Sequence, residues 1–477
     1  MSKPKINIYY KNAMAEVIGP RHGITQKQLD RILNTLPKKI QNLRSNPKIS
    51  QIEDAYRSLP YKTDMVEKIK EVASNLKSRC ENLVVFGIGG SALGIIALFT
   101  ALRPYMHNID DAKRTGPRLF VLDNIDPQQM NSLLKWLGRD QLRKTVFNVI
   151  SRGGQTAETM SQFLTTRQIL RCKIGHHGYR ERVVVTTTSG SDSTLYKIAD
   201  KQNDNLEHLI IPDDVVGRFS VLSAVGLFSA EMSGLDIDSL LAGACEMDKR
   251  VSRKNLCMNP AAINAAIKYH LYNKGKRISV MMPYSYALKD WADWYRQLWA
   301  ESLGKARGLD GKAVHIGPTP VKAIGATDQH SQVQLYREGP NDKLFTFLQV
   351  NDFGLSRERK IGQPPRSASE QRFLAGKNFS TQLNNEKKAT EYALLYDKRP
   401  CLTVAFDEVN EYTVGQFIYL YEVTTSFAGA LFGINPYNQP AVELGKEATF
   451  ALMGKEGYED FAKEIRSKMR IDEQYLV

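Results

Sequence analysis

Short apolar runs alternate with helical segments along most of this chain, and this alternation is the strongest constraint on its fold. Five such runs fall at residues 82–86, 118–122, 146–150, 182–187 and 208–211. Segments with helical periodicity, such as residues 156–171, lie between them. Short strands separated by helices are typical of βαβ units, whose strands pair in parallel. We therefore expect an α/β fold built on a parallel sheet.

The alternation recurs in the second half of the chain. A helical pattern at 260–273 precedes an apolar run at 277–282, and further strands are expected at 344–350 and 402–405. A chain of 477 residues has room for two or three domains. The expected division is an N-terminal helical segment at 1–75, α/β domains at 76–245 and 246–412, and a C-terminal helical segment at 413–477.

Composition argues against several protein classes. No apolar run approaches the roughly 20 residues that span a bilayer, and residues 1–6 lack the apolar stretch of a signal peptide. The five cysteines are scattered without a C-x-x-C pair, which argues against a disulfide framework and a zinc site. We expect a cytoplasmic protein that binds neither a membrane nor a metal.

The formal charge of +14 is unusual and has three interpretations. The simplest is a basic, solvated surface. A second is attraction of phosphate esters, and a third is nucleic-acid binding. The basic residues form no long run and do not alternate with aromatic residues, so we expect no nucleic-acid partner.

The first glycine loop, Gly87-Ile-Gly89-Gly90-Ser91-Ala92, directly follows an expected strand and opens a helix. It fits the G-x-G-x-x-A pattern of dinucleotide sites, and it lacks the Lys-Ser/Thr pair of a P-loop. Glycines at such a turn let backbone N–H groups approach an anion, which the helix N-terminus also favours. We expect Gly89, Gly90 and Ser91 to bind phosphate, although a tight structural turn explains the pattern equally well.

A second loop, Ser151-Arg152-Gly153-Gly154-Gln155-Thr156, also follows a strand and opens a helix. Its glycines and hydroxyls make another anion cradle. Two cradles at neighbouring strands favour a phosphomonoester, because a dinucleotide enzyme needs only the first. A nicotinamide-dependent dehydrogenase therefore stays a weaker alternative. We expect Ser151, Arg152, Gly153 and Thr156 to bind the phosphate.

Gln297 and Glu301 are four residues apart in the helical pattern at 289–304. This spacing places both side chains on one face of a helix. Glu301 is a candidate catalytic base; taken alone, a solvent-facing helix carboxylate is the better explanation.

These three stretches, read with three more, resemble the glucose-6-phosphate isomerase (phosphoglucose isomerase) family, including its bacterial members. The further stretches are Gly217–Ser220, Thr327–Ser331 and Gln439–Lys446. All six occur in the family's order, from the first glycine loop to near the C-terminus. The resemblance implies two sugar-isomerase (SIS) α-β-α sandwich domains with parallel sheets, plus N-terminal and C-terminal helical segments. It also implies a cytoplasmic homodimer without metal or organic cofactor.

The resemblance implies reversible conversion of glucose 6-phosphate to fructose 6-phosphate, a step of glycolysis and gluconeogenesis, by ring opening and cis-enediol proton transfer. Glu301 matches the family's base, and Arg218 matches the arginine that stabilises the enediolate. His330 matches the ring-opening histidine, which the partner subunit contributes. Lys446 matches a second polar catalytic group near the ring oxygen.

Gln297 and Gln439 match residues that contact the phosphate or the sugar. The second loop departs from the family, whose members usually carry Lys and then Ser or Thr after the residue matching Ser151. Here Arg152 and Gly153 occupy those places. One phosphate hydroxyl is therefore missing, although the backbone N–H of Gly153 is still available to an anion.

A protein of the same fold that binds sugar phosphates and regulates without catalysis is the alternative from another class. Such a module needs the phosphate loops but has no use for Glu301, His330 and Lys446 together. Their joint presence favours the enzyme.

Overall fold

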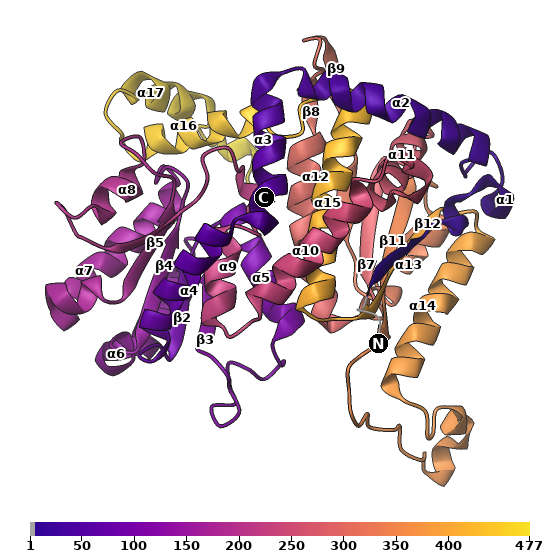
Figure 1. The fold of residues 1–477 in the computed structure, drawn as a ribbon, viewed down its shortest axis with the longest axis horizontal. Helices are drawn as coiled ribbons and strands as arrows, with labels where there is room; N and C mark the ends of the chain where they lie inside the picture. The colour runs from indigo at the N-terminus through magenta and orange to yellow at the C-terminus, as the bar shows by residue number, and fades with distance from the viewer. Residues whose placement is uncertain (1–4) are drawn as a thin grey trace. The chain divides into compact units, whose positions relative to one another are not determined.

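The computed structural model describes residues 5–477 and contains two five-stranded sheets made mostly of parallel strands (Figure 1). The first sheet has the order β3-β2-β4-β5-β6, and all neighbouring strands run parallel. Its strands are β2 (Asn82–Phe86), β3 (Arg118–Leu122), β4 (Thr145–Ile150), β5 (Val183–Thr187) and β6 (Glu207–Ile210). These are the five apolar runs of the sequence, and the expected α/β fold is confirmed.

Helices cover the first sheet on both faces, which explains why β2, β4 and β5 are buried at every residue. On one face, Leu133, Leu170 and Leu195 share a hydrophobic core with Phe147 and Val185 of the strands. The helices that supply these leucines are α6 (Pro127–Leu142), α7 (Ala157–Arg180) and α8 (Thr194–Ala199). The opposite face is covered by α4 (Thr63–Lys77), α5 (Leu93–Leu102) and α9 (Ala224–Met232).

The second sheet has the order β1-β12-β11-β7-β10. Its strands are β1 (Ile6–Tyr9), β7 (Ile278–Pro283), β10 (Thr319–Lys322), β11 (Lys343–Asp352) and β12 (Cys401–Glu408). All pairs are parallel except β1 with β12. β1 lies in a stretch whose pattern predicted helices, because Asn7 interrupts its short apolar run. Ile6, almost fully buried opposite Phe406, anchors it.

Four helices of the first part of the chain pack around one buried helix, α15 (Glu411–Phe432). It contacts α2, α10, α11 and α12, and every residue from Thr413 to Leu431 is buried. A helix that is enclosed on all sides can be apolar around its whole circumference. These four neighbours are α2 (Gln26–Arg44), α10 (Ile237–Val251), α11 (Pro260–Asn273) and α12 (Trp291–Leu303). Further helices of this part of the chain are α1 (Ala15–Ile18), α3 (Pro47–Ser58), α13 (Val333–Glu338) and α14 (Phe379–Tyr396).

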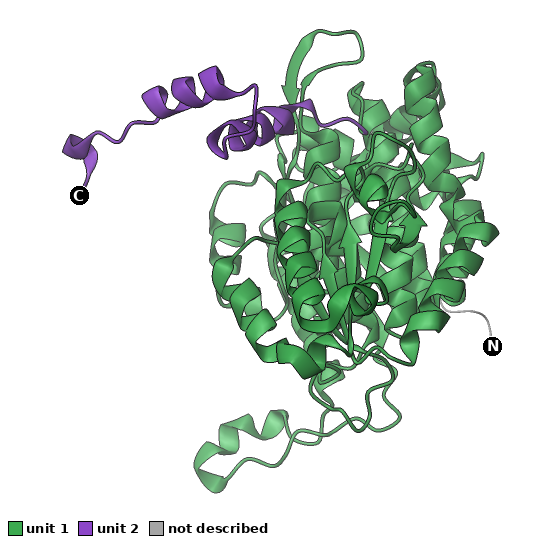
Figure 2. Cartoon of the chain, turned by 90° about the vertical axis from the view of Figure 1, so that its left-hand side faces the viewer, with its two compact units in different colours: residues 1–436 green, residues 437–477 purple. Residues whose placement is uncertain are grey.

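The chain forms two compact units, residues 1–436 and residues 437–477 (Figure 2). The first contains both sheets and α15. The second contains α16 (Glu443–Leu452) and α17 (Glu459–Lys468), which pack on each other; Phe450 meets Tyr458 edge to face at 6.3 Å. Residues 413–477, expected as one helical segment, are thus divided between the units.

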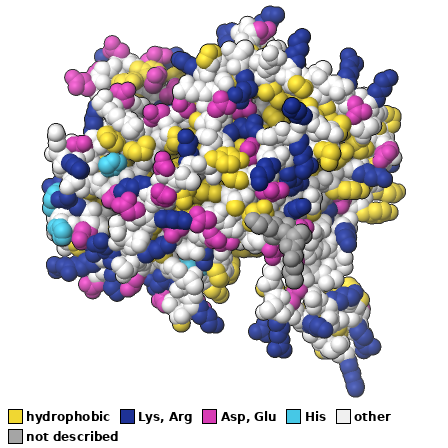
Figure 3. All heavy atoms as spheres, viewed as in Figure 1, with side chains coloured by type: hydrophobic (Ala, Val, Ile, Leu, Met, Phe, Trp, Pro, Cys, Tyr) yellow, Lys and Arg dark blue, Asp and Glu magenta, His cyan; other side chains and the backbone are white. Residues whose placement is uncertain are grey.

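Two segments extend from the first unit. Residues 353–378, between β11 and α14, project from it and include the short helix η8 (Arg366–Phe373) (Figure 1). An antiparallel hairpin of β8 (Lys305–Arg307) and β9 (Ala313–Ile316) follows α12. Figure 3 shows Lys and Arg side chains spread over one face among Asp and Glu, which fits a basic, solvated surface. None of the helices in residues 5–477 is long and apolar enough to cross a membrane.

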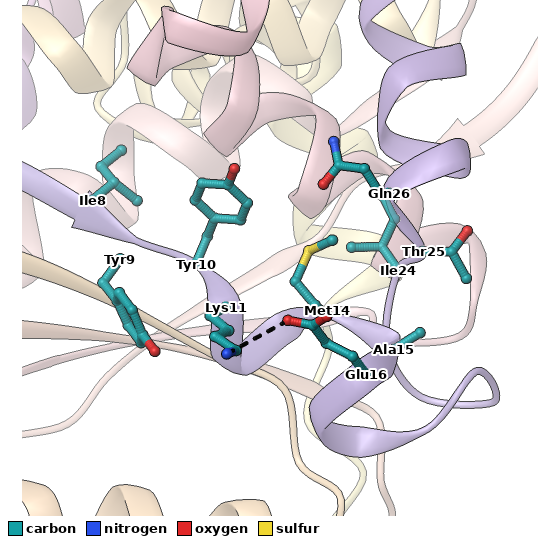
Figure 4. A pocket seen from close by; sticks show the side chains of 10 residues that line it. All are labelled: Ile8, Tyr9, Tyr10, Lys11, Met14, Ala15, Glu16, Ile24, Thr25 and Gln26. Atoms are coloured by element: carbon teal, nitrogen blue, oxygen red, sulfur yellow. Dashed lines mark ion pairs between the residues drawn. The ribbon is translucent and has the colours of Figure 1, made fainter.

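A pocket of about 470 Å³ lies beside β1 and the start of α2 (Figure 4). Residues between Ile8 and Gln26 line it, and the exposed side chains of Lys11 and Glu16 approach to 3.8 Å there. No residue of the expected site lines this pocket.

Candidate active site

Two loops follow neighbouring strands of the first sheet and lie at the same sheet edge. Phe86, the last residue of β2, pairs with Val149 of β4. The first loop leads into the short helix η3 (Gly89–Ser91), and the second runs from Ser151 to the start of α7. Because the carboxyl ends of parallel strands share one edge, a single ligand there can reach both loops.

The glycines of the first loop let two other segments come close. A Cβ at Gly90 would lie 2.2 Å from the carbonyl oxygen of Gly217, so two backbones touch at this point. Gly89 has a φ of +58°, and a Cβ there would lie 2.9 Å from Nε2 of Gln297. Only glycine fits such a position without displacing its neighbour. The first loop is therefore held against both the Arg218 segment and α12.

The second loop brings two hydroxyls together. Oγ of the buried Ser151 lies 3.1 Å from Oγ1 of Thr156, at the start of α7. The guanidinium of Arg152 donates to the carbonyl oxygen of Asp213 at 2.6 Å, so its charge lies beside the loop and is held by the backbone. Gly153 offers only its backbone to a ligand.

Helix α12 presents Gln297 and Glu301 on one face. Nε2 of Gln297 donates to Oε2 of Glu301 at 3.1 Å, as their spacing predicts. Tyr295 and Trp299, both buried, stack at 5.4 Å on another side of the helix and fix its rotation. Oε1 of Gln297 is buried and accepts no hydrogen bond from residues 5–477. A buried polar atom of this kind is expected to have a partner, and a ligand hydroxyl would supply one.

Arg218 lies in the short helix η4 (Gly217–Phe219), and its side chain is only 2% exposed. Its Nη1 is 3.5 Å from Oε1 of Glu301. Its Nε donates to Oγ of Ser302 and its Nη2 to the carbonyl oxygen of Pro436, each at 2.7 Å. Hydrogen bonds to a charged group contribute about 1.5–3 kcal/mol each, so the guanidinium is held firmly. The Glu301 side chain is 25% exposed and remains open to a ligand.

Two residues that the sequence pattern does not mark also contact this pair. Ser302 accepts a hydrogen bond from Nε of Arg218 and so orients it. Lys305 donates from Nζ to the carbonyl oxygen of Glu301 at 2.6 Å. Burial, reinforced by the charge of Arg218 and opposed by that of Glu301, lowers the pKa of Lys305 to about 8. The only sequence signal for Lys305 is its position four residues after Glu301.

His330 follows the short helix η7 (Thr327–Gln329) and is exposed. Within residues 5–477 of one chain, its ring makes no hydrogen bond or ion pair with Glu301 or Arg218. A hydrogen bond anchors the residue before it: the hydroxyl of Tyr284 donates to Oε1 of Gln329 at 2.6 Å. His330 is thus exposed next to an anchored residue.

The remaining two expected residues belong to the second unit. Lys446 lies on α16, about half exposed, with its Nζ 2.8 Å from Oε1 of Glu443. Gln439 precedes the short helix η9 (Pro440–Val442). Among residues 5–477, no three His, Cys, Asp or Glu side chains are grouped as metal ligands would be. The structure therefore brings together Gly89, Gly90, Arg218, Gln297 and Glu301 in the first unit.

Comparison with known proteins identifies the family. The family model described as phosphoglucose isomerase matches residues 39–461. A glucose-6-phosphate isomerase from Carboxydothermus hydrogenoformans is 46% identical over 411 residues, which cover 85% of this chain and 86% of that protein. One from Rubrobacter xylanophilus is 39% identical over 455 residues, covering 94% of this chain and 98% of the relative.

Solved structures have the same fold. A hypothetical protein from Thermus thermophilus matches with a TM-score of 0.79 and 30% identity, over 90% of this chain and 97% of that one. A glucose-6-phosphate isomerase from Chlamydia trachomatis shares the fold, with a TM-score of 0.78 at 20% identity, over 97% of this chain and 92% of its own. The chain therefore belongs to the phosphoglucose isomerase family.

Proposed function

We propose that this protein catalyses the reversible isomerisation of D-glucose 6-phosphate and D-fructose 6-phosphate in glycolysis and gluconeogenesis. The observation that carries the proposal is the pairing of the Glu301 carboxylate with the buried guanidinium of Arg218 at 3.5 Å, beside a glycine loop. Transfer of a carbonyl between C1 and C2 needs one base and one fixed positive charge, and this pair supplies both. Relatives named glucose-6-phosphate isomerase support the choice of substrate.

Substrate binding starts at the phosphate. Backbone N–H groups of Gly89, Gly90 and Gly153, with the hydroxyls of Ser91, Ser151 and Thr156, would hold it at the sheet edge, with Arg152 adding charge nearby. Gln297 would accept a hydrogen bond from the sugar through its buried Oε1. The sugar carbons would then extend toward Glu301.

Glu301 would remove the proton from one carbon and return it to the neighbouring carbon on the same face. Positioned general acid–base catalysis contributes about 10²–10⁴-fold to a rate. The negative charge of the cis-enediolate would develop beside Arg218. Removing one preorganised donor from such a site costs about 2.7–4 kcal/mol, so a fixed arginine is a large part of the catalysis.

Ring opening needs a second set of groups. In this proposal His330, donated by the partner subunit of a homodimer, moves the proton between the ring oxygen and the C1 hydroxyl. Lys446 and Gln439 act near the ring oxygen and the sugar. The exposed position of His330 supports a role across an interface. The chain's own side chains carry every proton, without metal or organic cofactor, and the enzyme works in the cytoplasm.

A coupled assay on the purified protein tests the activity. Formation of glucose 6-phosphate from fructose 6-phosphate, followed through a dehydrogenase, should be rapid for the wild type and nearly absent for Glu301→Gln. Mannose 6-phosphate is assayed separately as a substrate. A wild type that binds fructose 6-phosphate without turnover would instead support the regulatory module of the same fold.

Subunit exchange tests the shared site. Glu301→Gln and His330→Ala homodimers are each expected to be inactive. If His330 acts across the interface, exchange between them creates dimers with one intact site, and part of the activity returns. Verified exchange with no recovery would place His330 outside the partner's site.

A further inference from the structure

Lys305 lies two residues after the end of α12, and its side chain makes a hydrogen bond to the last turn of that helix. The helix ends at Leu303, and its last four carbonyl groups, including that of Glu301, lack partners within the helix. Nζ of Lys305 donates to the carbonyl oxygen of Glu301 at 2.6 Å. The ammonium group of Lys305 therefore caps a free carbonyl group in the last turn of α12, the turn that bears the proposed base.

The same turn also sets the position of Arg218. Oγ of Ser302 accepts from Nε of Arg218 at 2.7 Å, while Oε1 of Glu301 lies 3.5 Å from its Nη1. Any rotation of this turn would change both the distance from Ser302 to Arg218 and the distance from Glu301 to Arg218. Lys305, by fixing this turn, acts on both partners of the ion pair.

The ammonium of Lys305 lies in a strongly charged environment. The charged groups that act on it are Arg218 from η4 and Glu301 from α12. Burial is the main reason why the pKa of Lys305 falls to about 8, with Arg218 adding to the effect and Glu301 opposing it. Its charge therefore changes inside the range of an ordinary pH profile.

We propose that Lys305 is a positioning residue for the isomerisation, which fixes the last turn of α12 and adds a second positive charge beside the Glu301 carboxylate. The inference rests on the proposed function. A nearby positive charge stabilises the negative charge that develops on the enediolate. The loss of the Lys305 proton near pH 8 should therefore weaken catalysis at higher pH.

The experiment compares pH profiles of kcat and kcat/KM on fructose 6-phosphate. Lys305→Met removes both the charge and the hydrogen bond at similar length. We expect kcat to fall about tenfold or more with KM nearly unchanged, because the base is misplaced. The decline of kcat that follows the loss of the Lys305 proton near pH 8 should disappear. Lys305→Gln, which keeps an N–H donor without charge, should recover part of kcat and should also lack this decline.

Lys312→Met is the matched control. Lys312 lies in the turn of the β8–β9 hairpin, its side chain is 81% exposed, and it pairs with Asp310 at the surface. This variant should behave as the wild type, and an equal loss of the decline near pH 8 would trace the effect to bulk charge and overturn the proposal.

Thermal unfolding checks that each variant is folded. If Lys305→Met does not fold, Lys305→Gln and Lys305→Arg decide the question, since Arg stays charged above pH 8 and should keep kcat without the decline. A decline near pH 8 that persists in the uncharged variants, with an active wild type, would overturn the role of Lys305 alone. An inactive wild type would overturn the proposed function itself.

Discussion

The guanidinium of Arg218 and the carboxylate of Glu301 approach to 3.5 Å, yet the two side chains differ sharply in their freedom. Arg218 is 2% exposed and bound to Ser302 and the carbonyl of Pro436. Glu301 is 25% exposed. The cation is therefore the fixed member, and the carboxylate is the member that can reach a carbon-bound proton. Preorganised charge of this kind needs no reorganisation as the reaction proceeds.

Glu301→Gln should lower kcat by about 10²–10⁴-fold while the protein still binds a phosphorylated sugar acid. The amide keeps the size of the side chain but cannot accept the proton. Turnover by the coupled assay and binding by calorimetry separate the two effects. Glu338→Gln is a close control, because Gln334 and Glu338 form the same i, i+4 pair on an exposed face of α13, with 2.8 Å between Nε2 and Oε2. Near wild-type turnover by Glu301→Gln would remove Glu301 from the base role.

Arg218→Ala should lower kcat more than it raises KM, by about 10²–10³-fold. The interaction strengthens as negative charge develops on the enediolate, so its loss is felt mainly in the transition state. Steady-state kinetics on fructose 6-phosphate give the two constants. A rise in KM with unchanged kcat would reassign Arg218 to substrate binding.

Gly90→Ala should destabilise the protein by about 1–3 kcal/mol, because its Cβ would lie 2.2 Å from the carbonyl oxygen of Gly217. The first loop must then move away from the Arg218 segment. Both the free energy of unfolding and kcat/KM should therefore fall. Gly362→Ala is the control, since no described atom lies within 4 Å of its Cβ position and its φ is not left-handed. Equal unfolding midpoints for the two variants in denaturant would contradict this account.

Gly153→Ser should restore a phosphate hydroxyl and lower KM for fructose 6-phosphate by about tenfold, the effect of one hydrogen bond to a charged group. The position has room, because the nearest described atom to a Cβ is Cγ of Gln155 at 3.9 Å. Gly153→Ala separates the hydroxyl from the added carbon. An equal change in KM for both variants would show that the hydroxyl makes no bond to phosphate.

Glu422→Gln should make stability less dependent on pH. Glu422 is fully buried in α15, neither carboxyl oxygen has a hydrogen-bond partner in residues 5–477, and burial raises its pKa well above the usual value. The folded state then holds a proton that the unfolded state has released. Stability falls by about 1.4 kcal/mol per pH unit above the unfolded pKa, until pH reaches the folded pKa.

Glutamine carries no such proton, so the free energy of unfolding of Glu422→Gln should decline less between about pH 5 and pH 8. Urea unfolding at several pH values measures it, with Glu338→Gln on the surface as the control. Parallel pH profiles for Glu422→Gln and the wild type would show that Glu422 is not protonated in the folded protein.

Patterns within short stretches of the sequence were enough to predict the first sheet and part of the site. The five apolar runs became strands because parallel strands covered on both faces are apolar throughout. Gln297 and Glu301 meet because helical geometry brings residues four apart together. These features depend on neighbours in the sequence, which is why the sequence predicts them.

Features that depend on distant neighbours could not be predicted. β1 and β10 have four residues each, and only their pairing with β12 and β7 makes them strands. Arg218 is held partly by the carbonyl of Pro436, and Lys305 donates to the carbonyl of Glu301. Every residue has a backbone carbonyl, so a hydrogen bond to one does not require any particular residue type and cannot be recognised in the sequence.

The contact between Gly90 and Gly217 joins the first loop to the Arg218 segment backbone to backbone, with no side chain between them. A phosphate bound by the first loop is therefore held at a set distance from Arg218 and from the carbons that exchange the proton. Binding at the phosphate end of the sugar thus positions the other end for the chemistry. Sugars without a phosphate should accordingly lose turnover as well as affinity.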